Sequence, residues 1–177
     1  SEGLFGLVTA CELKLSPRPA DYLDLFFSLP SERQALNVLD GVRRRFHGEL
    51  SVLSAFEYFG VNCRHYMDHE PRFFHGTDEV AMYIQQPLFG QTIDQAAESW
   101  MDLLAEMGEV DEDAILLLDS DTSRSLFLEA RHSLPANALE VVQHHGTYTI
   151  MTDTVVPPDR FEEFLEYTHG IIRDRGL

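Results

Sequence analysis

A strand–helix–strand order that occurs twice between residues 21 and 119 constrains the fold more than any other feature of the sequence. In each copy, a strand-like apolar segment is followed by a capping box, an amphipathic helix and a glycine that ends the helix. The predicted strands are residues 21–29, 50–59, 79–89 and 113–119. The capping boxes and terminal glycines are Ser31 with Gln34 and Gly48, and Thr92 with Gln95 and Gly108.

This order predicts an α+β fold of the ferredoxin-like, split βαβ type, in which an antiparallel sheet carries two helices on one face. Val38 and Trp100 mark the apolar stripes of the two helices, so we expect both residues to face the sheet. Residues 60–79 follow neither the helical nor the strand period. They predict an irregular excursion or a ligand-facing loop.

The rest of the chain predicts a partial second ferredoxin-like unit. Thr122 or Ser123 is expected to cap a helix that Pro135 either kinks or restarts. A strand over residues 147–156 and a last helix from Pro158 are expected to follow. Because the sequence stops before a partner strand that would complete this unit, we expect the domain to be truncated at its C-terminus.

The N-terminal segment differs in character from the repeated part. Residues 9–15 alternate in the manner of a strand, and Pro17 and Pro19 then form a stiff connector. No initiator Met precedes this strand. We therefore expect a domain boundary near Pro19, with residues 1–19 belonging to a preceding domain and its linker, and residues 20–177 forming the second domain.

The charge of the chain argues against nucleic acid as a partner. The sequence has 13 Lys and Arg against 30 Asp and Glu, a formal net charge of -17, which repels a phosphate backbone. No apolar run is long enough to span a bilayer, and the N-terminus lacks the layout of a signal peptide. We expect a cytoplasmic protein without a transmembrane segment, in which Cys11 and Cys63 are buried thiols.

Two groups of residues suggest chemistry. Cys63, His65, His69 and His75 are possible zinc ligands, but their segment has no helical face to align them, which favours surface histidines and no metal site. Arg131 lies beside a mainly apolar helical stripe, so we expect its guanidinium to be held near the sheet. There it either forms a structural ion pair or binds the carboxylate of an acid substrate.

Several segments resemble, in the same order, a known family. SEGLFGLVT is similar to the segment that ends the flavin-binding domain of FAD-linked oxidases of the vanillyl-alcohol oxidase type, and CELKLSPRP to the exit strand and linker after it. LSAFEYF, LFLEARHSLPANALEVVQHHG and TDTVVPPDRFEEFLE are similar to motifs of their C-terminal cap, or substrate, domain. The resemblance is to the glycolate oxidase, D-lactate dehydrogenase and D-2-hydroxyglutarate dehydrogenase branches.

The resemblance implies a fragment of an FAD-dependent oxidoreductase that oxidises a 2-hydroxy acid or a similar small anion. Residues 1–19 are then the C-terminal remnant of the FAD-binding domain, with its linker, and residues 20–177 are a truncated cap domain that orients the substrate over the flavin. The FAD-binding domain of the same protein is the implied partner, and the fragment alone is expected to be inactive. The family's metal-binding histidine motif is expected beyond Leu177.

Position by position, the resemblance assigns roles to two sets of residues and implies no catalytic or metal-binding residue. Arg131 matches the arginine that binds the substrate carboxylate. Met151 stands where some relatives have a lysine, which leaves a second cationic contact to a dicarboxylate in doubt. The alternative to a fragment of a flavoenzyme is a free-standing ferredoxin-like module that binds a protein or small molecule without flavin. The segment implied to run along FAD contains Ser1, Glu2, Gly3, Gly6, Leu7 and Val8.

Overall fold

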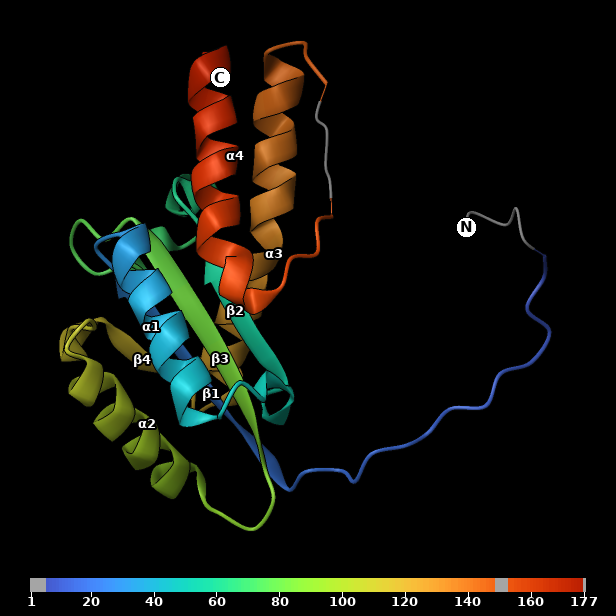
Figure 1. Cartoon of the computed structure of the whole chain (residues 1–177), viewed down its shortest axis with the longest axis vertical. Coiled ribbons are helices and arrows are strands. Elements are labelled where there is room, and N and C mark those ends of the chain that lie inside the picture. The colour runs from blue at the N-terminus through green and yellow to red at the C-terminus, as the bar shows by residue number, and fades with distance from the viewer. Residues whose placement is uncertain (1–5, 149–152, 177) are drawn as a thin grey trace.

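A four-stranded antiparallel sheet forms the centre of the molecule (Figure 1). The computed structural model describes residues 6–148 and 153–176. The strand order is β2-β3-β1-β4, and the element order along the chain is that of the split βαβ unit. The predicted ferredoxin-like α+β fold is confirmed. The strands are β1 (Asp21–Leu29), β2 (Ala55–Phe59), β3 (Val80–Leu88) and β4 (Ile115–Leu117).

Helices α1 (Glu32–Arg45) and α2 (Ile93–Met107) pack on one face of this sheet, as predicted. Val38 and Trp100 are buried there among the odd-numbered side chains of β1. Thr92 and Gln95 form a complete capping box at the start of α2. In α1, Ser31 caps the helix, but the Gln34 side chain accepts a hydrogen bond from the Ser31 hydroxyl instead of the backbone N–H.

The opposite face of the sheet is covered by helix α3 (Asp121–His144) and by residues 60–79. The excursion is irregular, as predicted, and contains the 3-10 turns Cys63–Tyr66 and Glu70–Arg72. It contributes buried apolar side chains to the core, among them Phe73 and Phe74. Phe26 of β1 lies at the centre of this layer, with ring centroids 5.4–6.0 Å away in Phe59, Phe73, Phe74 and Phe127.

Helix α3 differs from the prediction at its start and in its middle. It begins at Asp121, because the Ser120 hydroxyl accepts a hydrogen bond from the N–H of Ser123 and so caps the helix. The helix continues through Pro135, so of the two outcomes predicted there, a kink or a restart, the restart is wrong. Proline removes only one backbone donor. Ala130 and Leu134 pack in the turn before it, and Asn137 after it donates a hydrogen bond to the carbonyl of Tyr66, so both sides of Pro135 are held.

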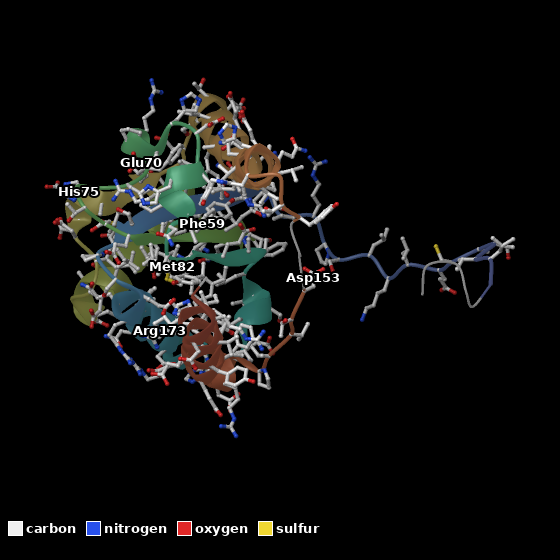
Figure 2. All side chains as sticks on the ribbon, turned by 90° about the horizontal axis from the view of Figure 1, so that it is seen from above. Phe59, Glu70, His75, Met82, Asp153 and Arg173 are labelled. Carbon is white, nitrogen blue, oxygen red and sulfur yellow. The ribbon has the colours of Figure 1, made fainter. Side chains whose placement is uncertain are left out.

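Helices α3 and α4 (Phe161–Arg175) lie on opposite faces of the sheet beside β2 (Figure 2). Successive side chains of β2 explain this arrangement, because they point to opposite faces. Phe59 faces Phe127 of α3, with ring centroids 6.3 Å apart, and Tyr58 faces Phe161 of α4 at 6.0 Å. The 3-10 turn Pro158–Arg160 leads directly into α4.

Two predicted strands have a different outcome. Residues 6–19 have no regular secondary structure and extend away from the sheet, so the strand predicted at residues 9–15 is not formed (Figure 1). A strand needs the backbone of a neighbour, and no other part of the described chain supplies one here. Residues 149–152, the centre of the strand predicted at 147–156, lie outside the described residues, and the described residues on either side form no strand.

The cysteines also differ from the prediction. Cys11 is exposed on the N-terminal segment, whereas Cys63 is partly buried against the sheet. The prediction that Cys11 is buried is therefore wrong, because the strand predicted at residues 9–15 is not formed. In the described part of the chain, no helix combines the length and apolar character needed to cross a membrane.

Removing the ring of Phe26 is expected to destabilise the chain strongly. Phe26 is fully buried among four other rings, so Phe26→Ala leaves a cavity and lowers the free energy of unfolding by about 3–5 kcal/mol. Phe89→Ala is the control, because Phe89 is 62% exposed. Urea unfolding followed by the fluorescence of the single tryptophan, Trp100, measures both variants. Equal losses would contradict the packing described here.

Candidate functional site

Helix α3 brings three side chains onto the sheet at positions separated by about one turn each. Arg124, Phe127 and Arg131 lie on the side of α3 that faces the strands. Phe127 fills the aromatic layer between the two arginines, with its ring centroid 4.6 Å from that of Tyr83. The two arginines therefore contact the sheet on either side of the apolar contact that Phe127 makes.

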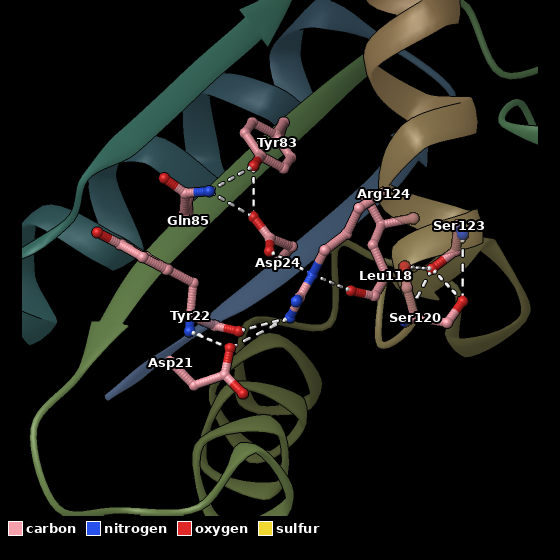
Figure 3. A network of polar contacts seen from close by, with 9 residues as sticks. All are labelled: Asp21, Tyr22, Asp24, Tyr83, Gln85, Leu118, Ser120, Ser123 and Arg124. Atoms are coloured by element: carbon pink, nitrogen blue, oxygen red, sulfur yellow. Dashed lines mark hydrogen bonds and ion pairs between the residues drawn. The ribbon is translucent and has the colours of Figure 1, made fainter. Parts of the chain in front are cut away.

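Arg124 is part of a polar network around a buried carboxylate (Figure 3). Asp24 on β1 is only 4% exposed. Arg124 Nε lies 3.0 Å from Asp24 Oδ2, and Tyr83 and Gln85 donate hydrogen bonds to Asp24 Oδ1. The same guanidinium donates to the carbonyls of Leu118 (3.0 Å) and Tyr22 (2.9 Å).

The network satisfies the Asp24 carboxylate without leaving an exposed reactive group. Burial raises the pKa of Tyr83 above its ordinary value, and the hydrogen bond to Asp24 raises this pKa further. Tyr83 therefore remains a neutral donor. A buried carboxylate requires such partners, because an unpaired charge in the core is strongly unfavourable. We interpret this network as the contact that fixes the first turns of α3 on the sheet.

Arg131 lies further along the same side of α3 and binds Glu57 of β2. Its Nε and Nη2 donate to Glu57 Oε2 and Oε1, both at 2.7 Å. The hydrogen bonds to Glu57 raise the pKa of Arg131. The two side chains are 36% and 32% exposed, unlike Asp24. Within residues 6–148 and 153–176, Arg131 Nη1 has no hydrogen-bond partner.

A pocket of about 430 Å³ opens beside this ion pair. Its wall carries one guanidinium and one carboxylate, and most of the remaining wall is apolar. Burial raises the pKa of the Cys63 thiol to about 11, so the thiol at this wall stays protonated at neutral pH. The pocket is lined by Glu57, Tyr58, Phe59, Gly60, Cys63, Arg131, His132, Leu134 and Pro135.

Another hollow, of about 650 Å³, lies on the other face of the sheet between α1, β2 and α4. It is lined mainly by aliphatic and aromatic side chains and contains none of the residues that the sequence predicts as a site. The pocket beside Arg131 is smaller, but a charged guanidinium lines it, and a ligand can reach that group from solvent. It is therefore the candidate functional site.

The residues expected to run along FAD are not brought together with Arg131. Ser1, Glu2 and Gly3 lie outside the described residues, and residues 6–8 lie in the extended N-terminal segment (Figure 1). Gly6 has a φ of +129°, which favours glycine, and an added Cβ there would meet no atom within 4 Å. The open backbone fits a close approach of another group, but these exposed residues do not themselves enclose a flavin.

The histidine-rich excursion does not converge on a metal site in the structure. The described residues contain no group of three or more His, Cys, Asp and Glu side chains placed to hold a metal ion. The Nε2 atom of His69 lies 3.8 Å from a carboxylate oxygen of Glu129 on α3. Cys63 faces the pocket beside Arg131.

Sequence analysis missed the residues that hold the two arginines. Asp24 stands in an otherwise mainly apolar strand, and a charge at a buried position signals that a partner must exist. Glu57 lies within the LSAFEYF segment on which the family resemblance rests, but that resemblance gave it no role. Its contact with Arg131 joins elements far apart in sequence, so no local pattern reveals the pair.

We expect Asp24→Ala to destabilise the chain by about 3–5 kcal/mol, because it removes the buried acceptor that Arg124, Tyr83 and Gln85 share. The carboxylate that remains beside Arg124 is that of Asp21, which is 3.7 Å away and half-exposed. Asp40→Ala is the control, since Asp40 also pairs with an arginine but is 57% exposed. Its loss is expected to stay within about 1 kcal/mol. Urea unfolding measures both variants, and a small effect at Asp24 would contradict the role of the buried network.

The two cysteines are expected to differ in alkylation by iodoacetamide. A pKa of about 11 leaves Cys63 roughly one part in a thousand thiolate at pH 8, and burial slows its reaction further. Cys11 is exposed and reacts first. Because the thiolate fraction grows as pH rises towards the pKa, Cys63 labelling should accelerate about tenfold per pH unit between pH 8 and 10. Peptide mass spectrometry follows both sites, and equal rates at pH 8 would disprove the burial of Cys63.

Comparison with known proteins identifies the family. Residues 25–177 match the family described as "FAD linked oxidases, C-terminal domain". No curated protein matches the chain. The match begins within β1 and covers the rest of the ferredoxin-like unit, α3, α4 and the candidate site. The chain belongs to this family of FAD-linked oxidase C-terminal domains, and the intact protein is accordingly an FAD-linked oxidoreductase.

Proposed function

We propose that the intact protein oxidises a 2-hydroxy acid or a similar small anion, and that Arg131 binds the substrate carboxylate. The observation that carries this proposal is the bidentate contact of Arg131 with a carboxylate at the rim of an accessible pocket. The planar guanidinium is thus already oriented for carboxylate binding. Its Nη1 edge offers further donors on the same cation.

The competing interpretation is that Arg131 serves only as a structural ion pair. A partly exposed pair contributes little to stability, typically about 0–1 kcal/mol, because water screens the charges. The buried contact between Arg124 and Asp24 already fixes α3 on the sheet. Holding the helix therefore does not require Arg131, which supports a role in binding.

We further propose that residues 1–19 are the end of the FAD-binding domain and its linker, and that residues 20–177 are the cap domain. The exposed apolar side chains of the N-terminal segment, such as Leu7 (95%) and Leu15 (85%), support contact with another domain. Ser1, Glu2, Gly3, Gly6, Leu7 and Val8 are the residues proposed to line FAD.

The flavin supplies a hydride acceptor for the substrate's α-carbon. The contribution of this chain is orientation: Arg131 fixes the carboxylate, which limits the directions in which the α-hydrogen can point. The largely apolar wall around Phe59 and Leu134 gives the carbon chain of the acid a surface to pack against. The alternative of a free-standing module without flavin is disfavoured by the family match, whose description specifies FAD-linked oxidases.

Replacement of Arg131 tests the proposal in the intact flavoprotein. Loss of a charge-assisted, bidentate contact should lower kcat/KM for the 2-hydroxy acid by roughly ten- to a hundredfold in Arg131→Ala. Arg131→Lys should be intermediate, because an ammonium keeps the charge but not the fork. KM should rise and kcat should fall, since the α-hydrogen is also misoriented.

Arg160→Ala is the matched control, because Arg160 also pairs with a glutamate but is 66% exposed and lies outside the pocket. The structural interpretation predicts another result for Arg131→Ala, namely a lower melting temperature with nearly normal kinetics. Unchanged kcat/KM in Arg131→Ala would exclude Arg131 from the substrate site.

A further inference from the structure

We infer that Glu57 is a positioning residue of the carboxylate site: it holds the guanidinium of Arg131 in the orientation that hydride transfer requires, and leaves the edge formed by Nη1 and Nη2 to the substrate. The inference rests on the proposed carboxylate binding by Arg131 and adds a residue that acts through that arginine. The observations behind it are the geometry of the ion pair, the strand that bears Glu57, and the place of the pair at the pocket.

The two hydrogen bonds between Glu57 and Arg131 fix the plane of the guanidinium. Glu57 accepts from Nε and Nη2, both at 2.7 Å, so the fork can neither rotate nor slide freely. A guanidinium has five N–H groups in one plane, and three of them are not used by this contact. One N–H of Nη1 and the second N–H of Nη2 lie parallel on the next edge, which is the geometry that another carboxylate binds.

Glu57 can hold this orientation because the sheet holds Glu57. Its backbone lies at the centre of β2 and pairs with Tyr83 of β3 in the antiparallel ladder. Phe59, two residues further on the same face of the strand, is 6% exposed and packs against Phe127 of α3. The carboxylate therefore stands on a fixed strand. The long side chain of Arg131 has many rotamers, and this contact restricts them before the acid arrives.

The pair lies where a substrate can use it. Both side chains line the pocket of about 430 Å³, and they are 36% and 32% exposed. An ion pair that water reaches to this extent contributes little to stability. Its two well-aligned hydrogen bonds are thus better explained by the orientation that they impose than by the stability that they add.

Glu57 has two opposing effects on the affinity for an acid. Its carboxylate orients the fork, which favours binding, but its negative charge repels an incoming anion. Glu57→Gln removes both effects with little change in shape, so the affinity should change little. Orientation of the bound acid has no such compensation, because hydride transfer depends on where the α-hydrogen points. The loss of Glu57 should therefore appear in the rate of hydride transfer.

Anaerobic reduction of the flavin in the intact flavoprotein separates these two quantities. Stopped-flow absorbance gives the limiting rate constant of reduction and the apparent Kd of the acid. The substrate is whichever of glycolate, D-lactate and D-2-hydroxyglutarate reduces the wild-type flavin fastest. We expect Glu57→Gln to lower the limiting rate constant about tenfold or more, with an apparent Kd within about threefold of the wild-type value.

A double-mutant cycle shows whether Glu57 acts through Arg131. In the Arg131→Ala background, Glu57→Gln should change the limiting rate constant by less than about twofold, because the fork that it orients is gone. Glu57→Asp keeps the charge but shortens the side chain by one methylene, so its rate should lie between those of the wild type and Glu57→Gln. Glu163→Gln is the control, because Glu163 also pairs with an arginine but is 71% exposed and lies outside the pocket. Its kinetics should equal those of the wild type.

A purely structural role for Glu57 predicts other results. The melting temperature of Glu57→Gln would fall while the folded enzyme reduced its flavin normally. A limiting rate constant within about twofold of the wild-type value, an apparent Kd that rises as much as in Arg131→Ala, or equal effects in both arginine backgrounds would each overturn the inference. If Glu57→Gln does not fold, Glu57→Asp takes its place, and a wild-type rate in Glu57→Asp has the same consequence.

Failure of the proposed function gives a different pattern. If none of the three acids reduces the flavin, or if Arg131→Ala leaves the kinetics unchanged, Arg131 is not the carboxylate site and the inference falls with it. If reduction depends on Arg131 but not on Glu57, only the positioning role of Glu57 is wrong.

Discussion

Burial of β1 on both faces is the constraint from which the rest of the structure follows. Its odd-numbered side chains pack against α1 and α2, while Phe26 forms the centre of the layer beneath α3. The second face also contains Asp24 and Ser28, which are 4% and 0% exposed. A polar group buried in this way requires a partner, so each of the two residues specifies where a neighbouring element must lie.

These two polar residues place the two elements that cover the second face. Ser28 donates to Asp78 at 2.6 Å and accepts from the backbone N–H of His75 at 2.9 Å, which attaches the end of the excursion to β1. Asp24 binds Arg124 and so fixes the first turns of α3. Since a helix is stiff over two turns, Arg131 then necessarily reaches the level of Glu57 on β2. The geometry of the candidate site thus derives from a buried aspartate two strands away.

Local signals predicted the parts of the fold that depend on nearby residues. The bounds of β1 and the capping box of Thr92 and Gln95 were predictable because alternation, apolar spacing and caps act within a few residues. The start of α3 was less determined, because Ser120 and Ser123 are both good caps within one turn. The pair formed by Glu57 and Arg131 was not predictable, since it depends on how α3 crosses the sheet. Likewise, a strand in the N-terminal segment requires a neighbour that the described chain does not provide.

Because the net charge of the chain is -17, the geometry of Arg131 is important for binding an anion at this site. The chain's overall field opposes the approach of an anion, although physiological salt screens that field beyond about 8 Å. Attraction must therefore come from contacts made after the anion has entered the pocket. A flexible lysine would lose much of its side-chain freedom in making such a contact, whereas the fork of Arg131 is already oriented by Glu57. Glu57 thus lowers the local positive charge but also fixes the direction in which the remaining N–H groups of Arg131 point. Donors with a fixed direction are what orienting a small acid requires.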